Sequence, residues 1–189
     1  MTKTSDIFHV AESIDKVICP PDQVFRNQDF EFLLTAGGHL VEDDEQYNDL
    51  MRLLIEIGET TFTIKENIGA TLTDRKKTFE ALFSVNSDLK EFDSKIGEFD
   101  EHFGMTILHW FVHGKSKNWG IYIAEYPTIN IIGCTSELTG KFRKVFGIKG
   151  NGYEQEKELL HIELKLLDDP DDRKKFFENY KIKTHHNST

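Results

Sequence analysis

Polar side chains that could act as an acid, a base or a nucleophile gather in the segment 105–134. Alternating apolar residues predict three strands there, and the short connections between them predict an antiparallel meander. We take the register in which tight turns place His109 and Phe111 on the same face as Ile121 and Ile123. The polar members of that face are then His109, Glu125, Asn130 and Cys134.

The spacing of these groups argues against two kinds of catalytic site. A cysteine–histidine pair needs its base within hydrogen-bond reach of the sulfur, whereas His109 and Cys134 would lie two strands apart, about 10 Å at the usual strand spacing. His109 and His113 would lie about 13 Å apart along one strand, and the chain has no HExxH or CxxC motif. We therefore expect a buried thiol, a satisfied core histidine, no catalytic residue, no metal and no cofactor.

The opposite face of the predicted meander is aromatic, with Trp110, Tyr122 and Tyr126. Aromatic rings on a strand face are usually core residues. A stacking platform for a ligand would also need basic side chains beside it. Lys115 and Lys117 in the adjoining loop leave this alternative open.

A glycine-rich segment, KVFGIKGNGYEQE, precedes a predicted helix and offers an anion site. Backbone NH groups at a helix N-terminus can hold a phosphate. The spacing matches neither GxxxxGK[ST] nor GxGxxG, and a turn whose first glycine, Gly147, caps the preceding helix explains the pattern as well. The alternative function is therefore a small enzyme or sensor that binds a phosphate-bearing ligand at the loop 147–152. Its ligand-binding residues would be Arg143, Lys149, Gly150 and Gly152, with His109 or Glu125 as acid or base.

Acidity is the strongest signal in the composition. The chain of 189 residues has 33 acids and 23 bases, a net charge of -10, and residues 1–100 hold 21 of the acids but 10 of the bases. The densest cluster contains no base and consists of Glu42, Asp43, Asp44, Glu45 and Asp49. Such a cluster can steer a protein with a basic surface. It disfavours nucleic acid, whose binding depends on neutralised phosphates. The sequence thus favours a non-enzymatic, acidic protein-interaction module, such as an inhibitor or immunity-type protein for a basic partner.

These groups need a folded scaffold, and the order of predicted elements favours an α+β fold. We expect a single domain over residues 1–180 and a polar tail over 181–189 that frays. Its sheet is antiparallel or mixed, contains the three-strand meander at about 105–134, and is packed by several amphipathic helices. The chain has no apolar run of membrane-spanning length, no signal-peptide pattern and two cysteines. We therefore expect a cytoplasmic protein without a membrane partner, and a homodimer stays open.

The clearest helix is EDDEQYNDLMRLLIEIG, whose apolar residues follow a 3.6-residue period. One face carries Tyr47, Leu50, Met51, Leu54 and Ile55, and Gly58 suits a left-handed cap. Strands are predicted at Asp29–Thr35 and ETTFTIKE. Further helices are predicted from Thr73 through Phe83, from Ser87, from Ser136 to Gly147, over 154–167 and from Asp169.

Overall fold

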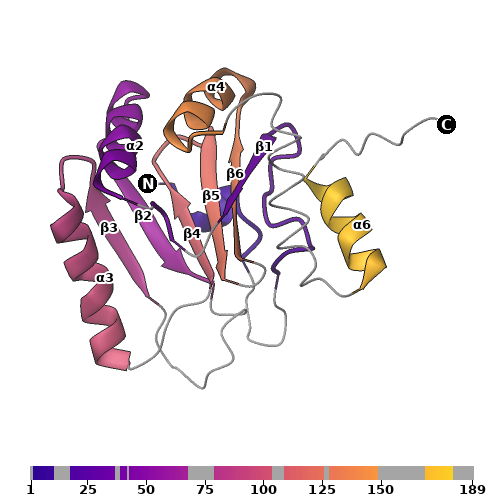
Figure 1. The fold of residues 1–189 in the computed structure, drawn as a ribbon, viewed down its shortest axis with the longest axis horizontal. Helices are drawn as coiled ribbons and strands as arrows, with labels where there is room; N and C mark the ends of the chain where they lie inside the picture. The colour runs from indigo at the N-terminus through magenta and orange to yellow at the C-terminus, as the bar shows by residue number, and fades with distance from the viewer. Residues whose placement is uncertain are drawn as a thin grey trace.

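A computed structural model of the protein contains a six-stranded antiparallel sheet with helices packed on it (Figure 1). The structure describes residues 2–10, 18–36, 39–41, 43–67, 79–103, 109–125, 128–148 and 169–180, with the backbone alone for Ala36, 98–103 and Glu125. The strands are β1 (Glu31–Ala36), β2 (Thr61–Glu66), β3 (Glu80–Ser84), β4 (His109–His113), β5 (Trp119–Glu125) and β6 (Thr128–Cys134). Within these described ranges the helices are α1 (Thr4–Ile7), α2 (Asp44–Glu56), α3 (Leu89–Phe103), α4 (Ser136–Val145) and α6 (Pro170–Asn179). The predicted α+β single-sheet class is confirmed.

The strands lie in the order β1-β6-β5-β4-β2-β3, and both faces of the sheet are covered. On one face, side chains from α2, α3 and α4 pack against Phe62, Ile64, Val112, Ile121 and Ile132. On the other face, the N-terminal segment and α6 pack against Leu34, Phe111, Tyr122, Ala124 and Ile131. Figure 1 accordingly shows α2, α3 and α4 grouped together and α6 apart from them. The two covered faces make two separate apolar cores.

Helix α2 forms largely as its local sequence predicts. The carboxylate of Asp43 accepts a hydrogen bond from the Gln46 backbone N–H at 2.8 Å and so caps the first turn. At the other end Gly58 has φ +84°, and the N–H of Glu59 reaches back to the Leu54 carbonyl, which confirms the predicted glycine cap. The apolar face differs in one position, because Ile55 is 51% exposed while Leu53 is buried.

The helix predicted to end at Phe83 is wrong, because residues 80–84 form strand β3. This strand pairs with β2, and Phe83 lies directly opposite Phe62, with ring centroids 5.3 Å apart. Cross-strand aromatic pairs of this kind stabilise a sheet and override weak local helix preference. The predicted cap Thr73, the helix over 154–167 and the tail over 181–189 lie outside the described residues.

The register predicted for β4 is also wrong, by one residue. His109 pairs with Ala124 and Trp110 pairs with Ile123, so Phe111 shares a face with Tyr122 rather than with Ile121. A one-residue slip turns every side chain of a strand to the other face. Trp110 therefore faces α3 while Tyr122 faces the N-terminal segment, and the predicted aromatic platform is divided between the two cores.

Candidate functional site

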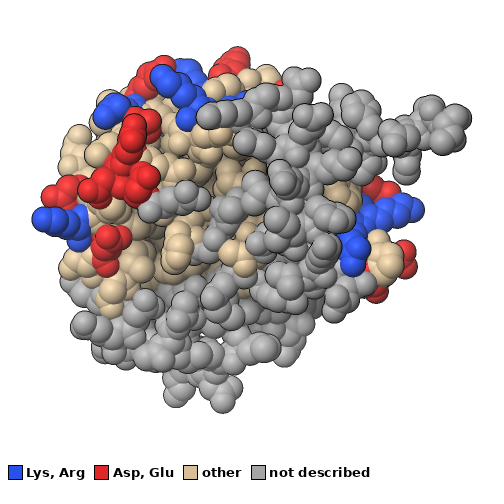
Figure 2. Space-filling model, in the orientation of Figure 1, with Lys and Arg blue, Asp and Glu red and all other residues tan. Residues whose placement is uncertain are grey.

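Two acid-rich segments lie on the same side of the sheet. Residues 43–56 hold five acids and one base, and residues 88–103 hold six acids and two bases. Asp44, Glu45 and Asp93 are exposed and make no ion pair with any described residue. Figure 2 shows acidic side chains gathered over α2 and the beginning of α3. We define the acidic face as Asp43, Asp44, Glu45, Asp88, Glu91 and Asp93, of which Glu91 also pairs with Lys95 at 3.5 Å.

Tyr47 connects the starts of α2 and α3. Its hydroxyl donates to the Ser87 carbonyl at 3.0 Å, and its ring centroid lies 5.6 Å from that of Phe92. Burial raises the pKa of Tyr47, and the carboxylates at the beginning of α3 raise this pKa further, to about 12. Tyr47 therefore joins the starts of the two helices and brings the carboxylates at the beginning of α3 near α2.

The predicted acidic cluster is only partly kept together. Asp43, Asp44 and Glu45 lie at the beginning of α2, but Glu42 lies outside the described residues. Asp49 pairs with Arg52 at 2.7 Å and lines a second cavity, of about 220 Å³, between α2 and α4. Asp49 is therefore partly neutralised and contributes to the α2–α4 groove rather than to the acidic face.

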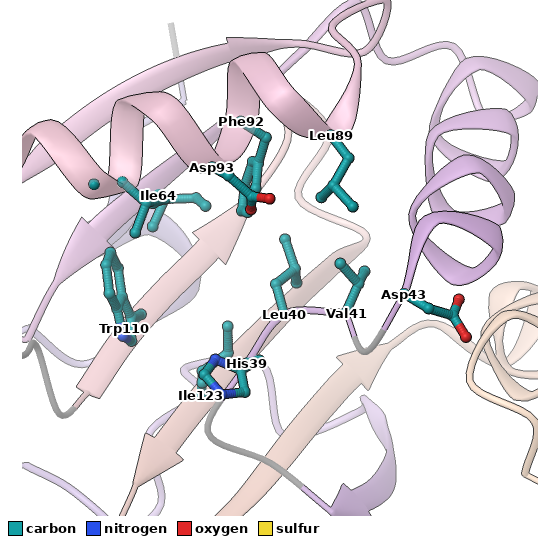
Figure 3. Close-up of a pocket in the computed structure, with 12 residues that line it drawn as sticks. His39, Leu40, Val41, Asp43, Ile64, Leu89, Phe92, Asp93, Trp110 and Ile123 are labelled. Carbon is teal, nitrogen blue, oxygen red and sulfur yellow. The ribbon is translucent and has the colours of Figure 1, made fainter.

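A cavity of about 360 Å³ lies between α3 and the sheet, next to the acidic face (Figure 3). One wall comes from α3: Leu89, Phe92, Asp93, Ile96 and Gly97. These residues follow the i, i+3, i+4, i+7 pattern, so they lie on one side of the helix. The opposite wall is Ile64 of β2, Trp110 of β4 and Ile123 of β5, and the segment before α2 adds His39, Leu40 and Val41. Most of the lining residues are therefore apolar or aromatic, although polar atoms make up slightly more than half of the surface that faces the cavity.

One carboxylate lies over this space. In Figure 3 the Asp93 carboxylate extends from α3 over the cavity, whereas the Asp43 carboxylate, at its edge where α2 begins, points away from the other lining side chains. Asn130, the cross-strand partner of Ile123, is 2% exposed and donates from Nδ2 to the His39 carbonyl at 2.6 Å, which fixes the segment at the cavity edge. Its Oδ1 has no hydrogen-bond partner in the described part of the chain. Such a space suits a ligand with an apolar stem and a positive end.

His109 belongs to a polar network on the opposite face of the sheet. The Tyr122 hydroxyl lies 3.0 Å from Nδ1 of His109 and accepts a hydrogen bond from the Asn67 side-chain amide at 2.9 Å. The same amide donates to the Ile18 carbonyl. Burial lowers the pKa of His109 to about 4, so the imidazole is neutral at pH 7. Asn67 thus ties the N-terminal segment to Tyr122 of the sheet, and His109 is the end of this network.

Arg143 is the described member of the predicted phosphate site. It lies on α4, and its Nη1 is buried without a hydrogen-bond partner in the described residues. Gly147 has φ +63° and caps α4, with the Ile148 N–H donating to the Arg143 carbonyl at 2.9 Å. Lys149, Gly150 and Gly152 lie outside the described residues, as does the side chain of Glu125. Because α4 packs on the other face of the sheet from His109, the structure does not bring Arg143 and His109 together.

Cys134 is buried next to α4 and is not an activated nucleophile. Its sulfur lies 3.7 Å from the Thr139 hydroxyl, which donates to Glu31 at 2.8 Å. Burial raises the pKa of the Cys134 thiol to about 11, so the thiol is protonated at pH 7. The corrected β4 register also places Cys134 and His109 on opposite faces of the sheet.

Glu59 is a buried carboxylate that sequence reasoning did not single out. Its Oε1 accepts from the Ser116 N–H, the Ser116 hydroxyl and Nε1 of Trp119, and its Oε2 accepts from the Lys115 N–H at 2.7 Å. Lys115 and Ser116 belong to the β4–β5 turn, and Trp119 is the first residue of β5. A Cβ on Gly114 would collide with this carboxylate, so the turn needs glycine there. Glu59 therefore holds the hairpin in place as a structural group.

Sequence reasoning also missed the cavity residues on α3. The one local signal is Gly97, a glycine in the interior of an amphipathic helix, where glycine is destabilising. A Cβ built on Gly97 meets nothing within 4 Å, so the glycine leaves space open rather than allowing a close contact. The approach of α3 to Trp110 across the sheet has no signature in the sequence.

Within the described ranges, we find no group of three or more His, Cys, Asp or Glu side chains that could hold a metal ion. The helices described there are also too short or too polar to cross a membrane. Comparison of the chain with protein-family models, with curated proteins and with solved structures finds no match. The candidate site is therefore argued from its own geometry and charge.

Proposed function

We propose that this chain is a non-enzymatic interaction module that binds a partner protein with a basic surface through the acidic face. One observation carries the proposal: Asp43 at the beginning of α2 and Asp93 near the beginning of α3 both line a cavity whose other lining residues are mostly apolar. Asp43 and Asp88 each cap a helix, but Asp44, Glu45 and Asp93 are left without an ion pair among the described residues.

Charge and apolar space play different parts in such a surface. Exposed carboxylates raise the association rate of an oppositely charged protein, and this effect weakens as salt rises. Affinity and lifetime come mainly from apolar anchors near the centre of an interface. The acidic face supplies the first property and the cavity beside it supplies the second. An inhibitor or immunity-type protein is the concrete form of this proposal.

The test is affinity capture from a native extract with three versions of the full chain. The acidic-face variant carries Asp44→Asn, Glu45→Gln and Asp93→Asn. The matched control carries Asp171→Asn, Asp172→Asn and Glu178→Gln on α6, which changes the net charge equally on the other side of the sheet. We expect a stoichiometric basic protein that leaves as salt rises, is retained by the control, and associates about tenfold more slowly with the acidic-face variant.

Two results would contradict this proposal. One is a partner that associates with the acidic-face variant and with the wild-type chain at the same rate. The other is the absence of any captured basic protein at low salt. Equal melting temperatures of the three proteins would show that the comparison reports on binding rather than on folding.

A second function, binding of a phosphate-bearing small ligand, rests on Arg143. A buried guanidinium nitrogen without a hydrogen-bond partner in the described chain is a donor that an anion would satisfy. Inorganic phosphate and pyrophosphate should then raise the melting temperature of the wild-type chain but not that of Arg143→Ala. Equal stabilisation of both proteins would refute the assignment to Arg143.

A further inference from the structure

The cavity beside the acidic face has the size of a small-ligand site. Its volume of about 360 Å³ lies at the lower end of the range for ligand pockets, about 300–1,000 Å³. The space is half open to solvent, so a side chain of another molecule can enter it beside Phe92 and Trp110. Figure 3 shows side chains from α3 and from the sheet facing it.

Gly97 is the reason that the cavity stays open on the side of α3. It lies eight residues after Leu89 on the same side of the helix, and any larger side chain there would extend into the space. Glycine within a helix lowers stability relative to alanine. The helix thus contains a destabilising residue at a wall position of the cavity, and no close backbone contact requires it.

The charges and the rings select the class of occupant. An anion would meet the carboxylate of Asp93, and a neutral apolar group would leave Asp93 without a partner. A positive group on an apolar stem satisfies both parts of the site, because methylenes can lie on the apolar walls while the charge stays near the carboxylate. The indole ring of Trp110, which lines the cavity, can also attract a cation.

We infer that the cavity is the receptor for one lysine or arginine side chain of the basic partner. This inference rests on the proposed function, since it specifies how the acidic face recognises its partner. The aliphatic stem lies against Ile64, Ile96 and Trp110, and the ammonium or guanidinium group lies near Asp93. The surrounding carboxylates steer the partner, and the single anchored side chain determines which basic proteins are held.

The test uses blocked amino acids as probes of the full chain by NMR titration. The probes are the N-acetyl methylamides of lysine, arginine and norleucine, the last of which keeps the apolar stem without the charge. We expect saturable shifts of the Trp110 indole signal with lysine or arginine in the millimolar range, and binding of norleucine about fivefold weaker. Asp93→Asn should weaken the binding of the lysine and arginine probes by a similar factor. It should leave norleucine binding unchanged, because asparagine has nearly the same volume as aspartate.

Gly97→Leu should fill the cavity and abolish probe binding without lowering the melting temperature. The matched control is Gly140→Leu on α4, where a Cβ also meets nothing within 4 Å, and which should bind as the wild-type chain does. Norleucine binding as tightly as lysine, or probe binding unchanged by Gly97→Leu, would overturn the inference. If Gly97→Leu does not fold, Asp93→Asn with the norleucine comparison still decides the question.

Partner capture separates this inference from the proposed function. If the Gly97→Leu protein captures the basic partner as tightly as the wild-type chain does, the inference that the cavity anchors a side chain of the partner is wrong, while the proposed function of the acidic face stands. If the wild-type chain captures no basic partner, the proposed function itself fails. Loss of capture with Gly97→Leu and retention with Gly140→Leu would support both.

Discussion

Acidification should destabilise this protein through His109. The imidazole is 6% exposed and bonded to Tyr122, and burial lowers its pKa from 6.5 to about 4. In the unfolded chain His109 becomes protonated below about pH 6.5, whereas in the folded chain it stays neutral until about pH 4. The unfolded state therefore binds more protons in this window, and the free energy of unfolding falls as the pH falls. His109 contributes a loss of about 2 kcal/mol between about pH 7.5 and about pH 5.

The measurement is urea unfolding of the wild-type chain and of His109→Gln across this pH range. His113 and His9 also have lowered pKa values, mainly through burial, so the wild-type chain alone would not isolate one group. The stability difference between the two proteins should shrink by about 2 kcal/mol on acidification, because the variant lacks that titrating group. His39→Gln, at an exposed position outside the Tyr122 network, serves as the control for a histidine-to-glutamine change. A constant difference between His109→Gln and the wild-type chain at every pH would refute the reasoning.

Three further predictions concern stability, each measured by thermal or urea unfolding. Glu59→Gln should destabilise by about 2–4 kcal/mol, because its amide NH₂ would face donors such as Nε1 of Trp119; a loss under 1 kcal/mol would contradict this. Gly58→Ala should lower the free energy of unfolding by about 1 kcal/mol, because residue 58 has a positive φ, whereas Gly97→Ala should raise it by up to about 1 kcal/mol. A change of the same sign in both variants would contradict the different roles of these two glycines. Asp43→Ala should lower the free energy of unfolding by about 1 kcal/mol, because the helix cap is lost. An unchanged unfolding midpoint would argue against the capping role of Asp43.

Where local chemistry dominates, the sequence was sufficient. The helix around Tyr47 and Leu50, its cap at Asp43 and its glycine end at Gly58 depend on groups within a few residues of each other. The same holds for α6, where Asp169 and Pro170 begin the helix as predicted. Such signals survive in any tertiary context, because backbone capping and positive φ are satisfied locally.

Where the partner is distant, the sequence was not sufficient. Phe83 could complete a helical face or a strand face, and its position opposite Phe62 decided for the strand. The alternation of residues within the strand that begins at His109 was predicted correctly. The register of this strand relative to β5 depends on the loop between them, and Glu59, from another part of the chain, holds that loop in place. A shift of one residue in the register was enough to place His109 and Trp110 each on the face of the sheet opposite to the one predicted.

The sequence by itself determined the acidity of this protein, the fold class and the positions of its best-capped helices. Only the tertiary structure decided that α2 and α3 bring their acids together, that Asp49 turns to Arg52, and that a cavity lies beside the acidic face. The physical reason is the range of the interactions. Charge and helix caps are properties of single residues and their near neighbours, whereas a cavity is made by walls that approach each other from β2, β4, β5 and α3. That approach is set by the packing of the whole core around Trp110 and Phe92.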